Sequence, residues 1–438
     1  MRVLKFGGTS VGSADRMKSV AKLINDGVPK VVVLSAMSGT TNALVEIAKA
    51  YHAKDKEKAG ELIGHLNMKY EFLLSELFKS VPAAEKGKAL IKNHFDYLRS
   101  FDTDSFSFNE ERLVLAEGEL ISTSLFRFYL EENKIDSVLI PALEFMRTDE
   151  NEEPDLNYIE DHLKKMLKGL KEHSVFITQG YICRDSFGAV SNLKRGGSDY
   201  TATLIGAALH SDEIQIWTDI DGMHNNDPRI VDKTKPVAEL SFDEAAELAY
   251  FGAKVLHPTC VNPARLRNVP VRLLNTMMPE AKGTLISNKS SGAEIKAVAA
   301  KDSIVAINIV SSRMLMAYGF LRNVFEVFER YKTPIDMIST SEVAVSVTID
   351  NTKNLDAIVK EISAFAVVSV EHNQSIICIV GDFLADKPGC AVQLFEAMRS
   401  VPIRMISYGG SKNNISLVVN TEHKKEALKL INKGLFGL

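Results

Sequence analysis

The sequence lacks the features that are typical of zinc-stabilised, disulfide-rich and membrane proteins. It has four cysteines in 438 residues, and none of them forms a CxxC pair. This argues against a zinc site or a disulfide framework and is typical of a reducing cytoplasm. The apolar start of the chain is too short for a signal peptide, and no run approaches the roughly 20 apolar residues of a membrane span. We therefore expect a cytoplasmic protein with no membrane partner.

Neither sign of charge dominates the sequence. Fifty-two basic and 56 acidic residues give a formal net charge of −4, and 45% of the residues are hydrophobic. Nothing in this balance indicates a nucleic-acid partner, so any anion site must be a local arrangement of basic side chains. The length exceeds one compact core and predicts two or three domains.

The first 290 residues alternate between strand and helix patterns. A short strand at 3–6 ends at Gly7-Gly8, apolar positions at helical spacing follow at 14–25, and a continuous apolar strand covers 30–35. Such alternation is typical of an α/β domain with a parallel sheet. Residues 52–108 are rich in Lys, Glu, Leu and Phe and predict helices inserted between strands, with Asn109 as the N-cap of the next helix. Further strands are expected at 137–140, 175–178 and 213–217.

The C-terminal part contains an internal repeat. Phe325-Glu326 recurs 70 residues later as Phe395-Glu396, and the PIDMIS of 334–339 recurs as PIRMIS at 402–407. Each copy has the pattern strand, helix, strand, strand, which predicts a duplicated α+β unit. Two unrelated α+β units are the alternative. The polar stretch SNKSSG at 287–292 is expected to link this region to the first domain.

Two glycine-rich stretches are candidates for anion binding. Lys5 directly precedes Phe6-Gly7-Gly8, and Arg195 precedes Gly196-Gly197-Ser198-Asp199. Glycines allow backbone N–H groups to approach an anion, and a following helix presents its positive end. Taken alone, each stretch is equally compatible with a plain turn or a helix start capped by Ser198 or Asp199. The sequence contains neither GxxxxGK[ST] nor GxGxxG, so P-loop and dinucleotide sites are excluded.

Other candidates carry weaker signals. Thr218 and Asp219 end a strand and could contact a ribose or an adenine edge, while Arg229 of the Asp-Pro-Arg turn could reach phosphates. Lys254 and Glu119 could face a nucleotide and a substrate ammonium, but each is also compatible with a solvated side chain. The sequence shows no metal-ligand spacing and no Ser-His-Asp order, so we expect no metal site made by the protein alone.

Together the motifs resemble the aspartokinase branch of the amino-acid kinase family over nearly the whole chain. They are KFGGTS at 5–10, LSAMSGTTN at 34–42, RGGSDYTA at 195–202, WTDIDG at 217–222, DPR at 227–229 and FGAKVLHP at 251–258. The resemblance implies a three-layer αβα kinase domain with a mostly parallel sheet over 1–290. It also implies two ferredoxin-like ACT regulatory domains, over 296–372 and 373–438.

The resemblance assigns roles to individual residues. Lys5 and Asp199 are implied as catalytic. The residues implied to bind ATP are Lys5, Gly7, Gly8, Thr218, Asp219, His224, Arg229 and Lys254, although His224 stands where many relatives carry tyrosine. Those implied to bind aspartate are Ser35, Thr41, Glu119, Arg195 and Ser198. The implied effector contacts are Met314, Phe320, Leu321, Asp336, Thr340, Ser341 and Glu342.

The implied reaction converts L-aspartate and ATP to 4-phospho-L-aspartate, the first step of lysine, threonine and methionine biosynthesis. A carboxylate nucleophile is already ionised, so the transfer needs charge neutralisation and positioning more than a general base, and Mg²⁺ is expected to arrive with ATP. The acids of the first repeat favour lysine as the inhibitor over threonine or S-adenosylmethionine. Open sheet edges predict a homodimer or homotetramer through the ACT domains.

Two other functions compete with this prediction. One is a kinase acting on a different carboxylate. The other is an inactive amino-acid sensor, which should have lost Lys5, Arg195 or Asp199, yet all three are present.

Overall fold

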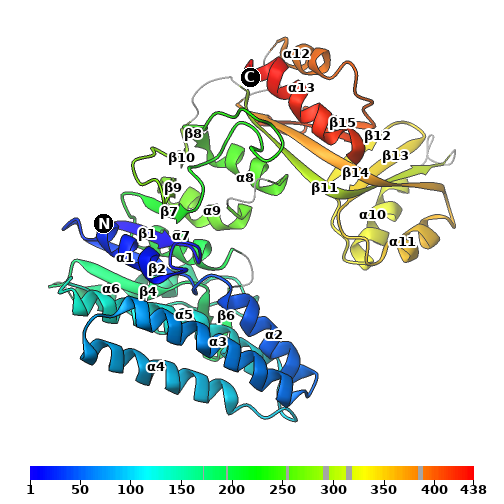
Figure 1. Ribbon diagram of the computed structural model, residues 1–438. Coiled ribbons are helices and arrows are strands. Elements are labelled where there is room, and N and C mark those ends of the chain that lie inside the picture. Colours follow the sequence, from blue (N-terminus) through cyan, green and yellow to red (C-terminus); the bar gives the residue numbers. More distant parts are fainter. Residues whose placement is uncertain (171, 194–195, 253–255, 290–294, 312–317, 383–387) are drawn as a thin grey trace. The chain divides into compact units, whose positions relative to one another are not determined.

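Figure 1 shows the computed structural model, which describes residues 1–438 except 171, 194–195, 253–255, 290–294, 312–317 and 383–387. The chain forms two compact units. The first comprises Met1–Met223 and Leu256–Asn288, and the second comprises His224–Val255 and Lys289–Leu438. Each unit is described by itself.

The first unit is built on a mostly parallel sheet. Its strands lie in the order β3-β4-β2-β1-β7-β9-β10, and β10 is antiparallel to β9. Phe6 pairs in register with Leu34 on one side and with Trp217 on the other, so the carboxyl ends of β1, β2 and β7 are level. The strands are β1 (Arg2–Phe6), β2 (Lys30–Leu34), β3 (Val138–Leu139), β4 (Val175–Gln179), β7 (Ile214–Thr218), β9 (Val271–Asn275) and β10 (Thr284–Ser287), with a separate hairpin of β5 (Ile182–Arg184) and β6 (Val190–Asn192).

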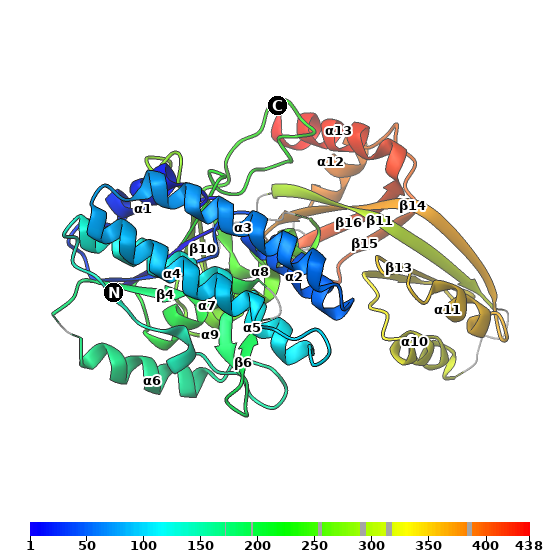
Figure 2. The ribbon, with the colours of Figure 1, turned by 60° about the horizontal axis from the view of Figure 1, so that its bottom comes forward.

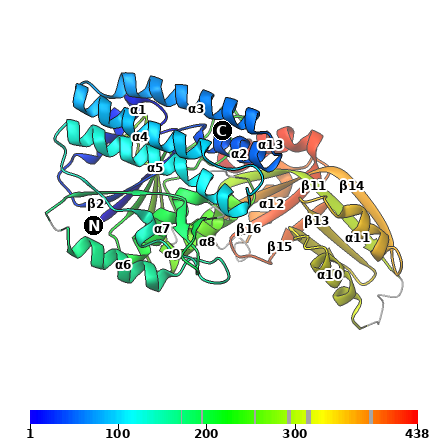
Figure 3. The same ribbon diagram turned by 90° about the horizontal axis from the view of Figure 1, so that it is seen from below.

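Helices cover both faces of this sheet, which gives three layers (Figure 3). On one face, alternate residues of β1, β2 and β4 form a large apolar cluster with five helices. These helices are α1 (Ala14–Ile24), α2 (Thr40–His52), α3 (Lys56–Leu77), α4 (Val81–Arg99) and α5 (Phe108–Glu132). On the other face lie α6 (Leu156–Lys168), α7 (Gly197–Ala208) and α9 (Pro258–Leu266). The predicted fold class of this part of the chain is confirmed.

Two predicted helix starts are wrong. The helix expected to begin after Asn109 is capped instead by Ser107, which forms a capping box with Glu110. Ser107 supplies the hydroxyl and Glu110 the returning carboxylate, whereas Asn109 lies inside the first turn. Likewise, α7 is preceded by Gly196 at φ 68° and not by a capping side chain from Ser198 or Asp199. The expected strands and the inserted helices α3 and α4 are confirmed.

The second unit contains the predicted repeat. Its strands lie in the order β12-β13-β11-β14-β16-β15. The first copy follows the chain through β11 (Ile295–Val310), α10 (Phe320–Arg330), β12 (Met337–Thr340), β13 (Ala344–Ile349), α11 (Leu355–Ile362) and β14 (Val367–Gly381). The second copy adds α12 (Cys390–Ala397), β15 (Met405–Tyr408), β16 (Asn414–Asn420) and α13 (Lys424–Phe436). Each copy packs its helices on its own apolar cluster.

Two long strands are shared between the copies. Figure 2 shows β11 and β14 running together through the unit, with α12 and α13 toward one end and α10 and α11 toward the other. Residues 305–310 of β11 pair with β13 of the first copy, whereas residues 295–301 pair with residues 376–381 of β14, which belong to the second copy. The boundaries 1–290, 296–372 and 373–438 stay a prediction. In the sheet, residues 296–301 lie with the second copy.

The two copies carry the same ion pair with its charges exchanged. In the first copy Lys301 bonds Asp336 at 2.8 Å. In the second copy Glu371 accepts from Arg404 at 2.8 Å, and both of these residues stand at the equivalent places of the repeat. The turn that follows shows the same exchange, because Glu342 of the first copy corresponds to Lys412 of the second. The two copies therefore have the same backbone arrangement but differ in the sign of charge at matching positions.

Residues 224–252 pack with the second unit although they precede the rest of it in sequence. They include β8 (Glu239–Ser241) and α8 (Phe242–Tyr250). Asn226 donates to the carbonyl of Leu428 in α13 at 3.0 Å, and Glu244 of α8 forms a buried ion pair with Lys296 of β11 at 2.7 Å. In the described part of the chain, no helix combines the length and apolar character needed to cross a bilayer.

Gly118→Ala in α5 should destabilise the protein. A Cβ at this position would lie 2.8 Å from Cβ of Ala36 and 3.2 Å from Cγ2 of Thr40. Overpacking of this kind costs about 1–3 kcal/mol, which exceeds the gain of up to about 1 kcal/mol from replacing a helical glycine. Urea denaturation should therefore show a lower free energy of unfolding.

Gly60→Ala in α3 is the matched control. A Cβ there would have no neighbour within 4 Å. This variant should gain roughly 0.5–1 kcal/mol, since only the helix propensity changes. Equal stabilities for the two variants would contradict the close packing of α5 on the segment after β2.

Candidate active site

A pocket of about 510 Å³ opens at the carboxyl ends of the parallel strands in the first unit. The segments that follow β1, β2 and β7 meet there because these strands end level with one another. Crevices at this edge are the usual ligand sites of open α/β sheets. The pocket is lined by Gly7, Gly8, Thr9, Ser35, Ala36, Met37, Ser38, Gly39, Thr41, Asn42, Glu119, Tyr181, Gly197, Ser198, Thr218 and Asp219.

Lys5 supplies a positive charge beneath this pocket. Its ammonium lies 2.6 Å from the carboxylate of Asp199, and only 11% of the lysine side chain is exposed. A Cβ on Gly7 would stand 3.5 Å from this ammonium, and one on Gly8 would stand 2.9 Å from the carbonyl oxygen of Ala36. The two glycines therefore leave room beside the lysine where side chains would intrude.

Two helices begin at the pocket without a side-chain cap. In the first unit α1, α3, α4, α5, α6 and α9 each have a capping side chain. Among the described residues no side chain caps α2 or α7, whose N-caps are Gly39 and Gly196 in the left-handed conformation. First-turn N–H groups lack helical partners, and the helix dipole favours an anion beside them. The pocket is thus bordered by two helix ends suited to anions, together with Lys5.

Glu119 gives the pocket one buried acid. Oε1 accepts from the backbone N–H of Ala36 at 3.1 Å, while Oε2 is buried with no hydrogen-bond partner among the described residues. Burial raises the pKa of Glu119 to about 8, against the opposing effects of the Ala36 N–H and the charge of Lys5. An unpartnered oxygen that has lost its water is well placed to receive a cationic group.

Tyr181 is a pocket residue that the sequence did not reveal. Its φ of 67° is unusual for a bulky residue. Two hydrogen bonds fix its backbone: its N–H donates to Thr201 Oγ1 at 2.9 Å, and its carbonyl oxygen accepts from the N–H of Leu193. Strained backbone of this kind gathers at functional sites. Burial, and next the charge of Glu119, raise the pKa of Tyr181 to about 12. Its backbone conformation marks Tyr181 as a site residue, and no sequence motif predicts that conformation.

The structure brings most of the predicted site residues together. Lys5 and Asp199 form the ion pair, and the pocket lining includes Gly7, Gly8, Ser35, Thr41, Glu119, Ser198, Thr218 and Asp219. Arg195, Lys254 and Met314 lie outside the described residues. His224 and Arg229 belong to the second unit. There, His224 Nδ1 contacts Thr234 Oγ1 at 2.7 Å, and the Arg229 guanidinium bonds Asp227 at 2.8 Å.

The predicted effector residues that the structure describes lie at the start of α10, which includes Phe320 and Leu321, and at the two ends of the edge strand β12. Phe320 begins α10 beside the left-handed Gly319, and Thr340, Ser341 and Glu342 lie exposed where β12 turns to β13. Asp336 lies at the start of β12, where Oδ1 accepts from Lys301 and from the hydroxyl of Tyr250, each at 2.8 Å. Its Oδ2 is buried without a hydrogen-bond partner in the part of the chain that the structure describes.

Comparison with known proteins gives matches over the whole chain. A model of the amino acid kinase family matches residues 1–275, and a model of the ACT domain matches residues 307–360 and 377–435. The chain is 37% identical to Aspartokinase 3, chloroplastic, of Arabidopsis thaliana, covering 99% of this chain and 81% of the relative. It is 33% identical to Lysine-sensitive aspartokinase 3 of Escherichia coli, covering 99% of each. The crystal structure of E. coli aspartokinase III with aspartate and ADP matches with a TM-score of 0.83 at 32% identity, covering 100% of both chains.

Glu119→Gln should change how stability depends on pH. The carboxyl titrates near 4.3 in an unfolded chain, whereas its pKa in the folded chain is about 8. As pH rises through this interval, the unfolded state releases its proton first, so the free energy of unfolding falls. The free energy of unfolding of the variant does not fall in this way, because the glutamine amide does not titrate. Its stability relative to the wild type should therefore rise by a few kcal/mol between about pH 5 and about pH 9, as measured by urea denaturation.

Glu76→Gln, on the exposed side of α3, is the control and should follow the wild-type profile. A constant difference in stability between Glu119→Gln and the wild type across this pH range would show that the pKa of Glu119 is not raised.

Proposed function

The chain belongs to the amino acid kinase family, in its aspartokinase branch, and from this premise we propose that it phosphorylates the side-chain carboxylate of L-aspartate with ATP. The product is 4-phospho-L-aspartate, which opens lysine, threonine and methionine biosynthesis. The observation that carries the proposal is the pocket where Lys5 and two helix N-termini without side-chain caps face one another beside the buried Glu119. The prediction of the family is confirmed.

The reaction requires no covalent bond between the substrate and the protein. An aspartate carboxylate oxygen attacks the terminal phosphorus of ATP, the bond to the bridging oxygen breaks, and its electron pair leaves with ADP. Because the nucleophile is already ionised, no general base is needed. Lys5 neutralises charge on the moving phosphoryl group, and Asp199 holds the lysine in place through their 2.6 Å ion pair.

Mg²⁺ is proposed to enter with the nucleotide as part of the substrate. The described residues contain no group of three or more His, Cys, Asp or Glu side chains that could bind a metal ion. Mg²⁺ commonly keeps its bonds to phosphate and water and takes few protein ligands. The acids at this site are therefore available for orienting groups of the protein and the substrate. Asp199 is paired with Lys5, and Asp219 accepts from Thr218 Oγ1 at 3.0 Å.

Aspartate is recognised through its ammonium and carboxylate groups. Glu119 receives the ammonium at Oε2, which has no hydrogen-bond partner among the described residues, while Ser35, Thr41 and Ser198 offer hydroxyls around the pocket. Arg195 is proposed to bind a carboxylate. The nucleotide is proposed to contact Gly7, Gly8, Thr218 and Asp219 in the pocket, with His224, Arg229 and Lys254 as further contacts.

An ADP-release assay distinguishes this function from its alternatives. Aspartate should give ADP release with MgATP, and glutamate should give little. Lys5→Met should lower kcat by roughly 100-fold or more, because a charge aimed at the transferring group acts mostly in the transition state, while the Kd for MgATP changes far less. Turnover with another carboxylate alone would identify a different kinase, and none with any carboxylate would favour the inactive sensor.

Lys30→Met is the matched control for Lys5→Met. Lys30 is also a buried lysine of the same sheet, but it lies at the amino end of β2, where it donates to the carbonyl of Ile24 at 2.8 Å. Its loss should lower stability while leaving kcat near the wild-type value. A similar fall in kcat for both variants would mean that Lys5 acts through folding alone.

Regulation by lysine is proposed through the first repeat. Asp336 and Glu342 supply acids there, whereas Arg404 and Lys412 occupy the equivalent places of the second repeat. A cationic amino acid therefore meets an acid at these two positions in the first copy only. The N-terminus of α10 begins at Gly319 with no side-chain cap among the described residues and suits the carboxylate of the effector.

The positions of these acids favour a homodimer. Asp336 and Thr340 are separated along β12 by about 13 Å at roughly 3.3 Å per residue, farther than one amino acid reaches. β12 is an edge strand of the sheet, and its Ile338 is 43% exposed. Antiparallel pairing of β12 with a second copy, centred near Ile338 and Ser339, would bring Asp336 of one chain beside Ser341 of the other. One effector could then contact both groups and favour one arrangement of the pair.

Glu342→Ala should weaken inhibition by lysine. Loss of a charged contact to the effector should raise the half-inhibitory concentration by roughly tenfold or more, with uninhibited turnover unchanged. Lys412→Ala, at the equivalent place of the second repeat, is the control and should retain wild-type inhibition. Calorimetry that detects threonine or S-adenosylmethionine but no lysine would overturn the choice of effector and leave the kinase assignment intact.

A further inference from the structure

One wall of the pocket is a segment that must keep an unusual shape. Ser38, Gly39 and Thr41 line the pocket between the end of β2 and the first turn of α2. Gly39 adopts a left-handed φ of 78°, and no side chain of the described residues caps the helix that it precedes. The backbone on the pocket side is therefore open to ligand and gains no support from a local cap.

Support for this segment comes from behind, from the inserted helix α3. Lys69 donates from Nζ to the carbonyl oxygen of Ser38, and its ammonium lies 3.3 Å from the place of a Cβ on Gly39. The next residue, Tyr70, shares a 3.0 Å hydrogen bond between its hydroxyl and Oγ1 of Thr40. Two adjacent residues of α3 thus hydrogen-bond to Ser38 and Thr40, on either side of Gly39.

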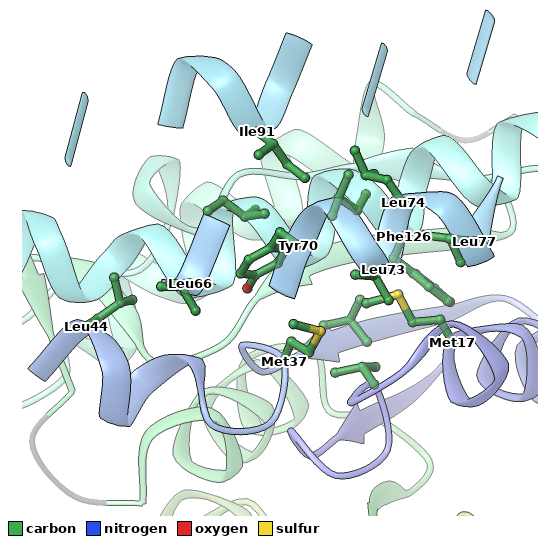
Figure 4. Packing of buried hydrophobic residues seen from close by; sticks show 14 of the residues in the cluster. Met17, Met37, Leu44, Leu66, Tyr70, Leu73, Leu74, Leu77, Ile91 and Phe126 are labelled. Carbon is green, nitrogen blue, oxygen red and sulfur yellow. The ribbon is translucent and has the colours of Figure 1, made fainter. Parts of the chain in front are cut away.

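The contact from Tyr70 is fully buried. Neither Tyr70 nor Thr40 has exposed surface, and burial raises the pKa of Tyr70 above its usual range. Figure 4 shows Tyr70 inside the apolar cluster among Leu66, Leu73 and Ile91, above the segment that carries Met37. A hydroxyl in such surroundings needs its hydrogen bond, since an unpartnered polar group there is costly. The hydrogen bond therefore fixes the first residue of α2, which is directly followed by Thr41.

We propose that Lys69 and Tyr70 are positioning residues of the aspartate site, through which the inserted helix α3 sets the shape of the segment 36–42. The proposal rests on the proposed function for the identity of the substrate. Tyr70 holds the first turn of α2 through Thr40, and Lys69 holds the carbonyl of Ser38 through the hydrogen bond from Nζ. Its positive charge also lies at the edge of a site that receives an anionic amino acid. Neither residue touches the reacting atoms.

Tyr70→Phe tests the buried contact against Tyr51→Phe. Tyr51 is an equally buried tyrosine whose hydroxyl donates to the carbonyl of Leu98 at 2.7 Å, away from the segment. Each variant loses one buried hydrogen bond. Tyr70→Phe should raise the KM for aspartate by about five- to tenfold while the KM for MgATP stays within about twofold, and Tyr51→Phe should change neither.

Lys69→Met tests the surface contact, with Lys58→Met as its control. Lys58 is an exposed lysine of the same helix that bonds Glu61 at 2.8 Å. Lys69→Met should raise the KM for aspartate several-fold. Lys69→Arg should have a KM closer to the wild-type value, because the guanidinium can still donate to the carbonyl of Ser38. Lys58→Met removes the same charge from α3 and should leave KM unchanged.

Hydrogen–deuterium exchange measures how well the backbone amides of residues 36–42 are protected, and it does not depend on enzyme turnover. Residues 36–42 should exchange faster in Tyr70→Phe and Lys69→Met than in the wild type, and at the wild-type rate in Tyr51→Phe and Lys58→Met. Equal exchange and equal KM across all four variants would overturn the positioning role. If the wild type failed to phosphorylate aspartate, the proposed function would fall, and the exchange rates alone would still decide whether α3 holds the segment.

Discussion

The ion pair between Lys5 and Asp199 joins the central strand of the sheet to the first turn of α7, and the arrangement of the pocket depends on it. At 2.6 Å and little exposed, each charge offsets the cost of burying the other. The pair keeps the lysine directed to the strand ends and engages the carboxylate of Asp199, which does not cap the first turn of α7. A cap from Asp199 would have occupied N–H groups of that turn within the protein.

Burial raises the pKa of Glu119 to about 8, which bears on the recognition proposed above. A bound ammonium group would stabilise the carboxylate and lower that pKa, so the proposed binding of aspartate would be coupled to the titration of this acid. Burial makes the empty site unfavourable for charge, and a cationic group would both pair with Oε2 and offset that cost.

Sequence patterns predicted the parts of the molecule that follow local rules. Continuous apolar strands such as 30–34 and the helices at 56–99 were placed correctly, and glycine-rich turns identified both ends of the pocket. Contacts between distant segments were not predictable. The left-handed Tyr181 depends on Thr201 and Leu193, and the support of Ser38 by Lys69 joins residues 31 positions apart. The repeat was detected, but a linear repeat does not show that β11 and β14 serve both copies.

The exchange of charge between the two copies has a consequence for stoichiometry. A duplication that kept the same charges would offer two equivalent sites for a cationic amino acid in every chain. With Asp336 matched by Arg404 and Glu342 by Lys412, a cationic amino acid meets an acid at these two positions in only one of the copies. Under the proposed regulation, saturation would correspond to one effector per chain, and any cooperativity between effector molecules would arise between chains and not between the halves of one.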